Sequence, residues 1–179
     1  SPAAARPVHW DQLMESLSQV ATLARSLGGG ECRTVRVLIS GETTGTIAGM
    51  FQRAGADVAT NDLGPTERPD IPHFQGDAMY IQDLGFDLVI THPECTRLSN
   101  AGVGQLYKQD LIHDLITDAA RFRRMRAANA PFIAAENPKM HKWARELIGG
   151  DRSTQYVHPW QHGTGHTKPT GLFLSPNLP

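Results

Sequence analysis

Cys95 is a candidate nucleophile because it follows a strand-like apolar run. The run Phe86–Ile90 leads into Thr91-His92-Pro93-Glu94-Cys95. A thiol placed between the end of a strand and the start of a helix can ionise to a thiolate, which is the nucleophilic form of cysteine. The alternative is a buried and inert cysteine, since cysteine often behaves as a small apolar side chain.

A carboxylate comes at a similar point later in the chain. Glu136-Asn137-Pro138 follows the apolar run Phe132–Ala135, which is typical of a buried strand. If burial raises the pKa of Glu136, this side chain can act as a proton donor. Otherwise it is a carboxylate at a helix start, where the helix dipole favours negative charge.

Two further acids are candidates for binding a ligand. Asp62 ends the strand-like run Val58–Asp62, and an acid at this point can accept hydrogen bonds from ribose hydroxyls, as in dinucleotide-binding folds. Asp77 follows Gly76 ahead of an apolar segment. It can accept a hydrogen bond from an exocyclic amine, or it is an ordinary turn residue.

The first turn of the pattern, Gly41-Glu42-Thr43-Thr44-Gly45, lies between the run Val35–Ile39 and a helix predicted for Thr46–Ala54. The start of that helix offers free N–H groups to a nucleotide-like ligand. The full G-x-G-x-x-G pattern is absent, so a helix-capping turn beside a solvated acid is an equally open interpretation.

The stretch His158–Thr170 combines three histidines with glycine and proline. His158, His162 and His166 suggest a metal site by their spacing, but the proline and glycines between them prevent one continuous helix from presenting the rings on one face. We therefore expect no metal. Lys168 and these histidines are better suited to contact an anion such as phosphate.

Strands and helices alternate along the chain, which predicts an α/β fold with a mainly parallel sheet covered by helices on both faces. The late runs Gln155–Val157 and Leu172–Leu174 look like further strands, and Gln105–Ala128 looks like one long helix. A shorter helix runs through Trp143 and Leu147. Ligands bind such sheets outside the carboxyl ends of the strands, where the polar clusters fall.

The first 30 residues are expected to form an arm and an amphipathic helix, and 31–179 a single domain. Apolar residues at helical spacing between Trp10 and Leu27 form one stripe, and three glycines end it. This helix either packs on the domain or mediates a homodimer.

The composition excludes several classes of protein. Hydrophobic residues make up 40% of the 179 residues, which is too many for a disordered chain. The formal net charge of -1 argues against a strongly basic nucleic-acid clamp. We find no apolar run of the roughly 18 residues that a membrane span needs and no signal-peptide pattern. Two cysteines, Cys32 and Cys95, are too few for a disulfide framework, so a cytoplasmic location is expected.

Read in order, these clusters resemble the pyrimidine C5 DNA methyltransferase family over most of the chain, from about Val35 to Leu174. The matching stretches are the turn and helix in Ile39–Gly55, Asp62, Gly76-Asp77, the cysteine loop in Asp87–Ser99, Glu136-Asn137 and, more loosely, Gln161–Leu174. The likeness is strongest to short phage and prophage proteins labelled DNA cytosine methyltransferase, which have similar Glu136–Lys142 and Pro159–Gln161 stretches.

The resemblance implies a Rossmann-like methyltransferase fold with S-adenosylmethionine as cofactor, in the cytoplasm of a bacterial host. The implied cofactor-binding residues are Glu42, Thr44, Gly45, Asp62, Asp77 and Pro93, and the implied catalytic residues are Cys95, Glu136, Asn137 and Lys168. The Cys95 thiolate would add to C6 of the pyrimidine, and Glu136 would hydrogen-bond the ring at N3.

The pyrimidine would belong to DNA or to a free nucleotide. A base in duplex DNA would have to be flipped out to reach the thiol. Arg121, Arg123 and Arg124 of the long predicted helix are the candidate DNA contacts.

Three departures from the family keep other functions open. In the first turn, Glu42 and Thr44 stand where a more apolar turn is common. Glu94 stands where the family has proline, and a carboxylate beside the thiol raises the pKa of the thiol. The chain also has no spare ~100 residues for a target-recognition domain. The alternatives are a related enzyme that performs another C5 or C6 reaction on a pyrimidine nucleotide, and a non-catalytic relative that binds a nucleotide, cofactor or partner protein.

Overall fold

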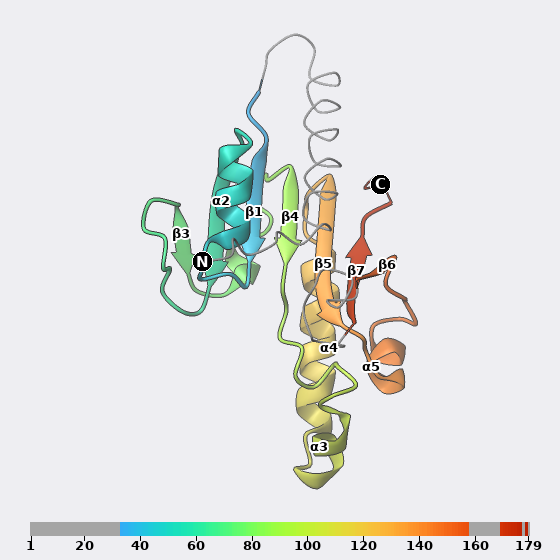
Figure 1. Cartoon of the computed structure of the whole chain (residues 1–179). Helices are drawn as coiled ribbons and strands as arrows, with labels where there is room; N and C mark the ends of the chain where they lie inside the picture. Colours follow the sequence, from blue (N-terminus) through green and yellow to red (C-terminus); the bar gives the residue numbers. More distant parts are fainter. Residues whose placement is uncertain (1–32, 158–168, 177, 179) are drawn as a thin grey trace, which may run out of the picture.

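A seven-stranded sheet organises the computed structural model, which describes residues 33–157, 169–176 and 178. The strand order is β3-β2-β1-β4-β5-β7-β6 (Figure 1). The strands are β1 (Arg36–Ser40), β2 (Asp57–Asp62), β3 (His73–Gln75), β4 (Leu88–Thr91), β5 (Phe132–Pro138), β6 (Gln155–Val157) and β7 (Thr170–Leu174). The helices are α2 (Thr46–Arg53), α3 (Val103–Lys108), α4 (Ile112–Arg126) and α5 (Lys142–Leu147), with a short 3-10 helix, η1 (Ala78–Tyr80).

The first five strands are parallel, which confirms the expected mainly parallel α/β sheet. β7 runs antiparallel to both β5 and β6. Because β1 to β5 are parallel, their carboxyl ends meet at one edge of the sheet, and the chain order reverses there between β1 and β4. Such a reversal opens a crevice in which doubly wound folds bind ligands.

Helices cover both faces of the sheet because its central strands are apolar on both sides. In β1, Val37 packs in the core cluster that contains Phe51 of α2, whereas Leu38 packs in the cluster on the opposite face. On that opposite face, Phe122 of α4 packs edge-to-face against Phe173 of β7, with 5.1 Å between ring centroids. The sheet is therefore held between layers, and its carboxyl edge has a fixed position.

The helix predicted for Gln105–Ala128 is wrong as one element, because the chain breaks between α3 and α4. Asp110 adopts a left-handed conformation, with φ at 52°. The N–H of Leu111 then donates to the carbonyl of Leu106 at 3.0 Å, as in a Schellman motif that ends a helix. The break redirects the chain, so that α3 lies beyond the carboxyl ends of the parallel strands (Figure 1).

The segment Leu63–Phe74 follows β2, and its last residues belong to the short edge strand β3. Asn61 fixes this connection, since its side-chain amide donates to the carbonyls of Phe74 at 2.9 Å and Gly76 at 2.8 Å. The apolar residues after Asp77 form η1, with Asp77 as the N-cap. Asp77 thus follows a strand end, at β3.

Some predictions concern other parts of the chain. Four predictions lie outside the described residues. They concern the N-terminal helix with its proposed homodimer role, the division at residue 30, Cys32, and the histidine-rich stretch up to Lys168. Within the described residues, none of the helices has the length and apolar character that a bilayer crossing needs.

Candidate active site

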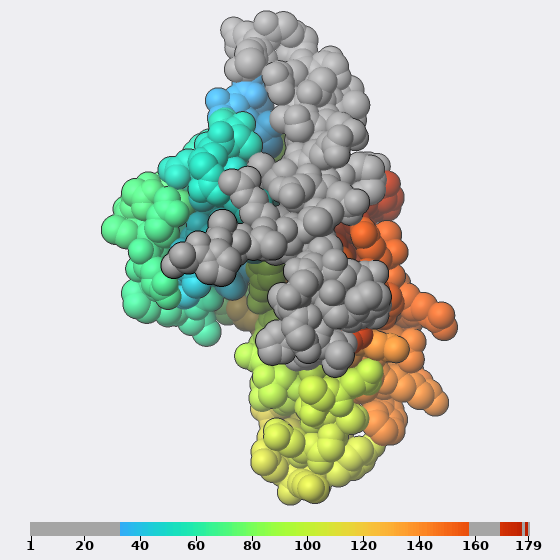
Figure 2. Space-filling view, viewed as in Figure 1, coloured from blue at the N-terminus to red at the C-terminus, as the bar shows by residue number. Residues whose placement is uncertain are grey.

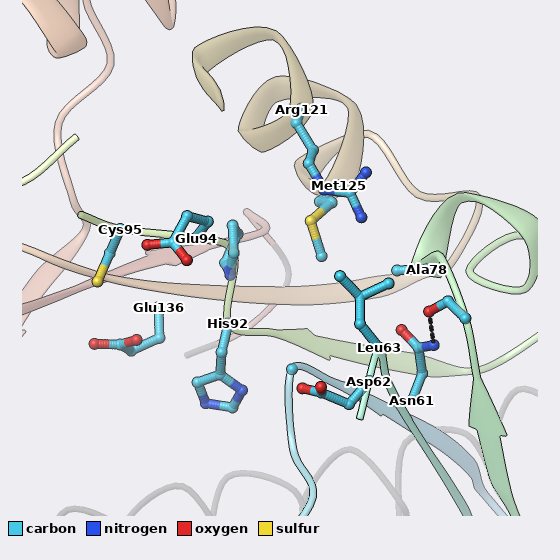
Figure 3. A pocket seen from close by; sticks show the side chains of 13 residues that line it. Asn61, Asp62, Leu63, Ala78, His92, Glu94, Cys95, Arg121, Met125 and Glu136 are labelled. Atoms are coloured by element: carbon cyan, nitrogen blue, oxygen red, sulfur yellow. Dashed lines mark hydrogen bonds between the residues drawn. The ribbon is translucent and has the colours of Figure 1, made fainter. Parts of the chain in front are cut away.

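A cavity of about 430 Å³ lies at the carboxyl edge of the sheet, a size that suits a small-molecule ligand. Its lining residues come from the ends of β1, β2, β4 and β5, the turn after β3, and α4 (Figure 3). They are Gly41, Asn61, Asp62, Leu63, Gly76, Ala78, His92, Pro93, Glu94, Cys95, Arg121, Met125 and Glu136. Chain order at the switch point brings these residues together.

Cys95 and Glu136 both line this cavity, so two of the predicted catalytic residues are brought together. Cys95 is partly exposed, and Figure 3 shows it on the same side of the cavity as Glu136. Successive strand residues point to opposite faces, and Asn137 is accordingly fully buried and does not line the cavity. The Glu-Asn pair therefore contributes its carboxylate to the site and its amide to the packing beside it.

The loop that carries Cys95 is bound to the segment that follows Glu136. His141 donates from Nε2 to the carbonyl of Arg97 at 2.8 Å and accepts the N–H of Ala144 at Nδ1, at 3.1 Å. Arg97 also forms an ion pair with Asp118 of α4, with 2.6 Å between Nε and Oδ2. These contacts hold the Cys95 loop against α4 and against the segment that follows β5, the strand that carries Glu136.

Gly102 explains how closely this loop folds back on itself. A Cβ at this position would lie 1.7 Å from the carbonyl oxygen of Thr96, which no side chain can occupy. The sequence shows a glycine at this point without showing that the main chain needs one.

Glu94 is held as an ionised carboxylate next to the thiol. Its oxygen accepts hydrogen bonds from both the backbone N–H, at 2.8 Å, and the hydroxyl of Thr96. These bonds lower the pKa of Glu94 below its ordinary value. We expect this negative charge to disfavour the thiolate form of Cys95.

Replacing Glu94 with glutamine is expected to make Cys95 more reactive. The amide keeps an oxygen for the Thr96 hydrogen bonds and removes the charge, so the pKa of the Cys95 thiol falls and alkylation by iodoacetamide at pH 7 speeds up by about threefold to tenfold. Mass spectrometry of the Cys95 peptide measures the rate. Glu146→Gln, on the exposed surface of α5, is the matched control and leaves the rate unchanged. An unaltered or slower rate in Glu94→Gln would show that the charge does not act on the thiol.

Asp62 lines the opposite part of the cavity from Cys95 (Figure 3). Its Oδ1 accepts the N–H of Gly64 at 2.8 Å, which orients the carboxylate at the end of β2. The position agrees with the predicted acid after the second strand. An oriented carboxylate at this point is able to accept hydrogen bonds from ligand hydroxyls.

Asp77 is engaged by the protein itself. Arg121 binds it in a bidentate ion pair, with both N–O distances at 2.7 Å, and the N–H of Met79 donates to Oδ1 at 2.9 Å. Arg121 is the main cause that lowers the pKa of Asp77. Asp77 is not among the cavity-lining residues, whereas its neighbours Gly76 and Ala78 and its partner Arg121 are.

The first turn presents less of itself to the cavity than predicted. Glu42 is buried and accepts the N–H groups of Ile47 at 2.6 Å and Ala48 at 3.1 Å, so its carboxylate caps α2. Thr44 is exposed and lies within hydrogen-bond distance of Thr46, and Gly45 is the N-cap residue of α2. Glu42, Thr44 and Gly45 do not line the cavity. The capping interpretation of this turn is confirmed for Glu42.

Pro93, a predicted cofactor-binding residue, lines the cavity, while Lys168 lies outside the described residues. Of the proposed DNA contacts, Arg121 faces Asp77, Arg124 forms an ion pair with Asp83, and Arg123 is exposed. Among the residues the structure describes, no cluster of three or more metal-ligating side chains is present.

Sequence reasoning missed several cavity residues, of which Gly41, His92 and Met125 are examples. Gly41 has φ at +83°, and a Cβ there would lie 2.5 Å from the carbonyl oxygen of His92. His92 directly follows β4 and comes three residues before Cys95. This position after a strand-like run could have identified it as a candidate from the sequence. Met125 comes from the buried side of α4 and carried no such signal.

Comparison with known proteins finds solved structures with a similar fold. No protein-family model and no curated protein matches the chain. A solved structure of WbdD, elsewhere described as a bifunctional kinase-methyltransferase, has a TM-score of 0.50 at 18% identity and covers 93% of this chain and 39% of its own. The chain thus spans about two fifths of the WbdD structure.

Two other structures with a similar fold are methyltransferases. A SAM-dependent methyltransferase from Agrobacterium tumefaciens has a TM-score of 0.46 at 17% identity, covering 93% of this chain and 60% of its own. A TehB-like SAM-dependent methyltransferase from Corynebacterium glutamicum has a TM-score of 0.43 at 17% identity, covering 94% and 98%. With its strand order and antiparallel β7, the chain has the Rossmann-like fold of S-adenosylmethionine-dependent methyltransferases.

Proposed function

We propose that the protein transfers a methyl group from S-adenosylmethionine to C5 of cytosine through a covalent adduct on Cys95. The observation that carries this proposal is the shared cavity of Cys95, Glu136 and Asp62 at the switch point of the sheet. A nucleophile, a carboxyl group and an acceptor for ribose thus face one space. The resemblance to pyrimidine C5 methyltransferases supports these same residues.

The described residues fit S-adenosylmethionine better than a dinucleotide. A pyrophosphate needs free N–H groups at the helix start after β1, but the carboxylate of Glu42 already accepts two of them and would repel a phosphate. S-adenosylmethionine has no phosphate. Asp62 would hold its ribose, and the turn at Gly76 and Ala78 would contact its adenine beside the Asp77–Arg121 pair.

The chain's own residues then act on the pyrimidine. The Cys95 sulfur forms a bond to C6, and the electron pair of the C5–C6 double bond becomes available at C5. Glu136 shares a proton with N3, which stabilises the negative charge that the addition creates. When bound, S-adenosylmethionine supplies the electrophilic methyl group that C5 takes up. Loss of the C5 proton and departure of the sulfur restore the ring.

The substrate is a cytosine in DNA or in a free nucleotide. A DNA substrate would add contacts from the exposed Arg123 and from Arg121 and Arg124. Binding of DNA would therefore weaken as the salt concentration rises. A free nucleotide would depend on the cavity alone.

A second candidate function is binding without catalysis, and the ionised Glu94 favours it. A ligand-binding relative would retain the Asp62 end of the cavity and would not need a reactive thiol. Another C5 or C6 reaction on a pyrimidine nucleotide is a further alternative. It would use the Cys95 adduct but would need no methyl donor.

Replacing Asp62 with asparagine tests the cofactor end of the site. Hydrogen bonds to a charged group contribute about 1.5–3 kcal/mol, so the affinity for S-adenosylmethionine is expected to fall by about 10- to 100-fold. Isothermal titration calorimetry measures the change. Asp57→Asn, at the exposed start of the same strand, is the matched control and keeps the wild-type affinity. If the wild-type protein shows neither binding heat nor a thermal shift with S-adenosylmethionine, this compound is not the ligand.

A further inference from the structure

His92 is a cavity residue that the proposed reaction has not yet used. His92 directly follows β4 and comes three residues before Cys95. Its side chain is partly exposed and lines the cavity. In Figure 3 its imidazole stands between Glu136 and Asp62, and all three residues line the same cavity. The ring therefore lies between the pyrimidine end and the cofactor end, where C5 would react.

The hydrogen bonds of His92 fix which ring nitrogen carries the proton. Nδ1 lies 3.2 Å from the carbonyl oxygen of Ser40, and the backbone N–H of His92 donates to the same oxygen at 2.9 Å. A carbonyl oxygen only accepts, so Nδ1 is the donor. In the neutral ring, Nε2 then keeps its lone pair.

The surroundings hold this ring in place. Gly41 packs directly against His92, since a Cβ at position 41 would lie 3.0 Å from the Cβ of His92. The Ser40 carbonyl holds both the main chain and the ring of His92. A base with a fixed tautomer and a fixed orientation is ready to take a proton without first reorganising.

We propose that His92 is the base that removes the proton from C5 before the sulfur leaves. The inference rests on the proposed C5 chemistry. Nε2 takes the C5 proton, the electron pair of the broken C–H bond re-forms the C5–C6 double bond, and the C6–S bond breaks to return the Cys95 thiolate. The imidazolium then gives its proton to water. No redox partner is needed.

Exchange of tritium from cytosine C5 tests this step without any methyl donor. Reversible addition of Cys95 to C6 lets C5 take a proton from water, and removal of the tritium by His92 then releases it to solvent. The probe is a single-stranded oligonucleotide library containing 5-tritiated cytosine, with 5-tritiated dCMP in a parallel arm. Because a general base contributes about 10²- to 10⁴-fold, His92→Asn is expected to slow tritium release by about 100-fold or more.

The asparagine variant separates catalysis from positioning. Its side-chain amide can still donate to the Ser40 carbonyl but presents no imidazole lone pair, whereas His92→Ala loses both. We expect added imidazole to restore tritium release in His92→Ala, which a purely structural role would not allow. His113→Asn, exposed on α4, is the matched control and exchanges at the wild-type rate.

A trapping experiment distinguishes failure of this inference from failure of the proposed function. With S-adenosylmethionine and a 5-fluorocytosine substrate, no C5 proton exists to be removed, so His92→Asn should form the covalent adduct in wild-type yield. If wild type forms neither adduct nor exchanged tritium with either substrate, the proposed function itself fails. If wild type does both and His92→Asn exchanges tritium equally fast, or loses the 5-fluorocytosine adduct, His92 is not the base for the C5 proton.

Discussion

Cys95→Ser is expected to abolish covalent trapping of 5-fluorocytosine and to lower methyl transfer by at least about 10³-fold. A serine hydroxyl is similar in size to the thiol but is not ionised near neutral pH, so it does not add to C6 at a useful rate. Mass spectrometry of the intact protein detects the adduct, and peptide mapping assigns it. The position of Cys95 on the cavity wall, with Glu136 beside it, is the physical reason for this prediction.

Cys32→Ser is the matched control for this experiment. Cys32 is the other cysteine of the chain, and its replacement should leave both adduct and methyl transfer at wild-type levels. Binding of S-adenosylmethionine should be retained in both variants, because the ribose contact is assigned to Asp62. Methyl transfer that survives in Cys95→Ser would remove the covalent mechanism, and the shared cavity would then serve another reaction.

Glu136→Gln is expected to reduce the rate of adduct formation by about 10²- to 10⁴-fold. The amide has nearly the same shape and can donate a hydrogen bond to N3. It cannot transfer a proton, so the negative charge that builds up on the ring is not neutralised. Because ground-state contacts are kept, the effect should appear in kcat much more than in KM.

The control for Glu136 is Glu146→Gln, which replaces an exposed glutamate of α5. Circular dichroism and thermal unfolding show whether either variant changes the fold. If Glu136→Gln retained full activity, proton sharing at N3 would be excluded as the role of this carboxylate. An increase in KM with unchanged kcat would instead assign Glu136 to binding alone.

Two segments that are distant in the sequence, the one after Cys95 and α5, lie together at the lower end of the molecule in Figure 2. Figure 2 shows the yellow-green surface of the segment after Cys95 projecting at this end, next to the orange surface of α5. Arg97 and His141 join these two segments, as described above. A hydrogen bond between residues that are far apart in the chain thus joins two segments beside the site.

Much of the fold was predictable because local patterns dictate it. The apolar runs at β1, β4 and β5 must be buried on both faces, which requires a parallel sheet with helices on either side. The carboxyl ends of parallel strands meet at one edge. The convergence of candidate residues at strand ends, such as Cys95, Glu136 and Asp62, could therefore be predicted without detailed knowledge of packing.

Other features depended on partners that no local pattern reveals. The break between α3 and α4 uses an aspartate in a left-handed conformation, although glycine is the usual signal for such an end. The helical periodicity on both sides of Asp110 is favourable, so the sequence predicted one continuous helix.

By itself, the sequence determined the α/β architecture and the three strand-end residues that share the cavity, because strand polarity and burial follow from local composition. Only the tertiary structure decided how the other acids are used. Glu42 caps α2, Arg121 engages Asp77, and Thr96 keeps Glu94 charged. A carboxylate can bind a ligand, a helix end or a guanidinium. Which of these partners it binds depends on contacts that only the folded chain creates.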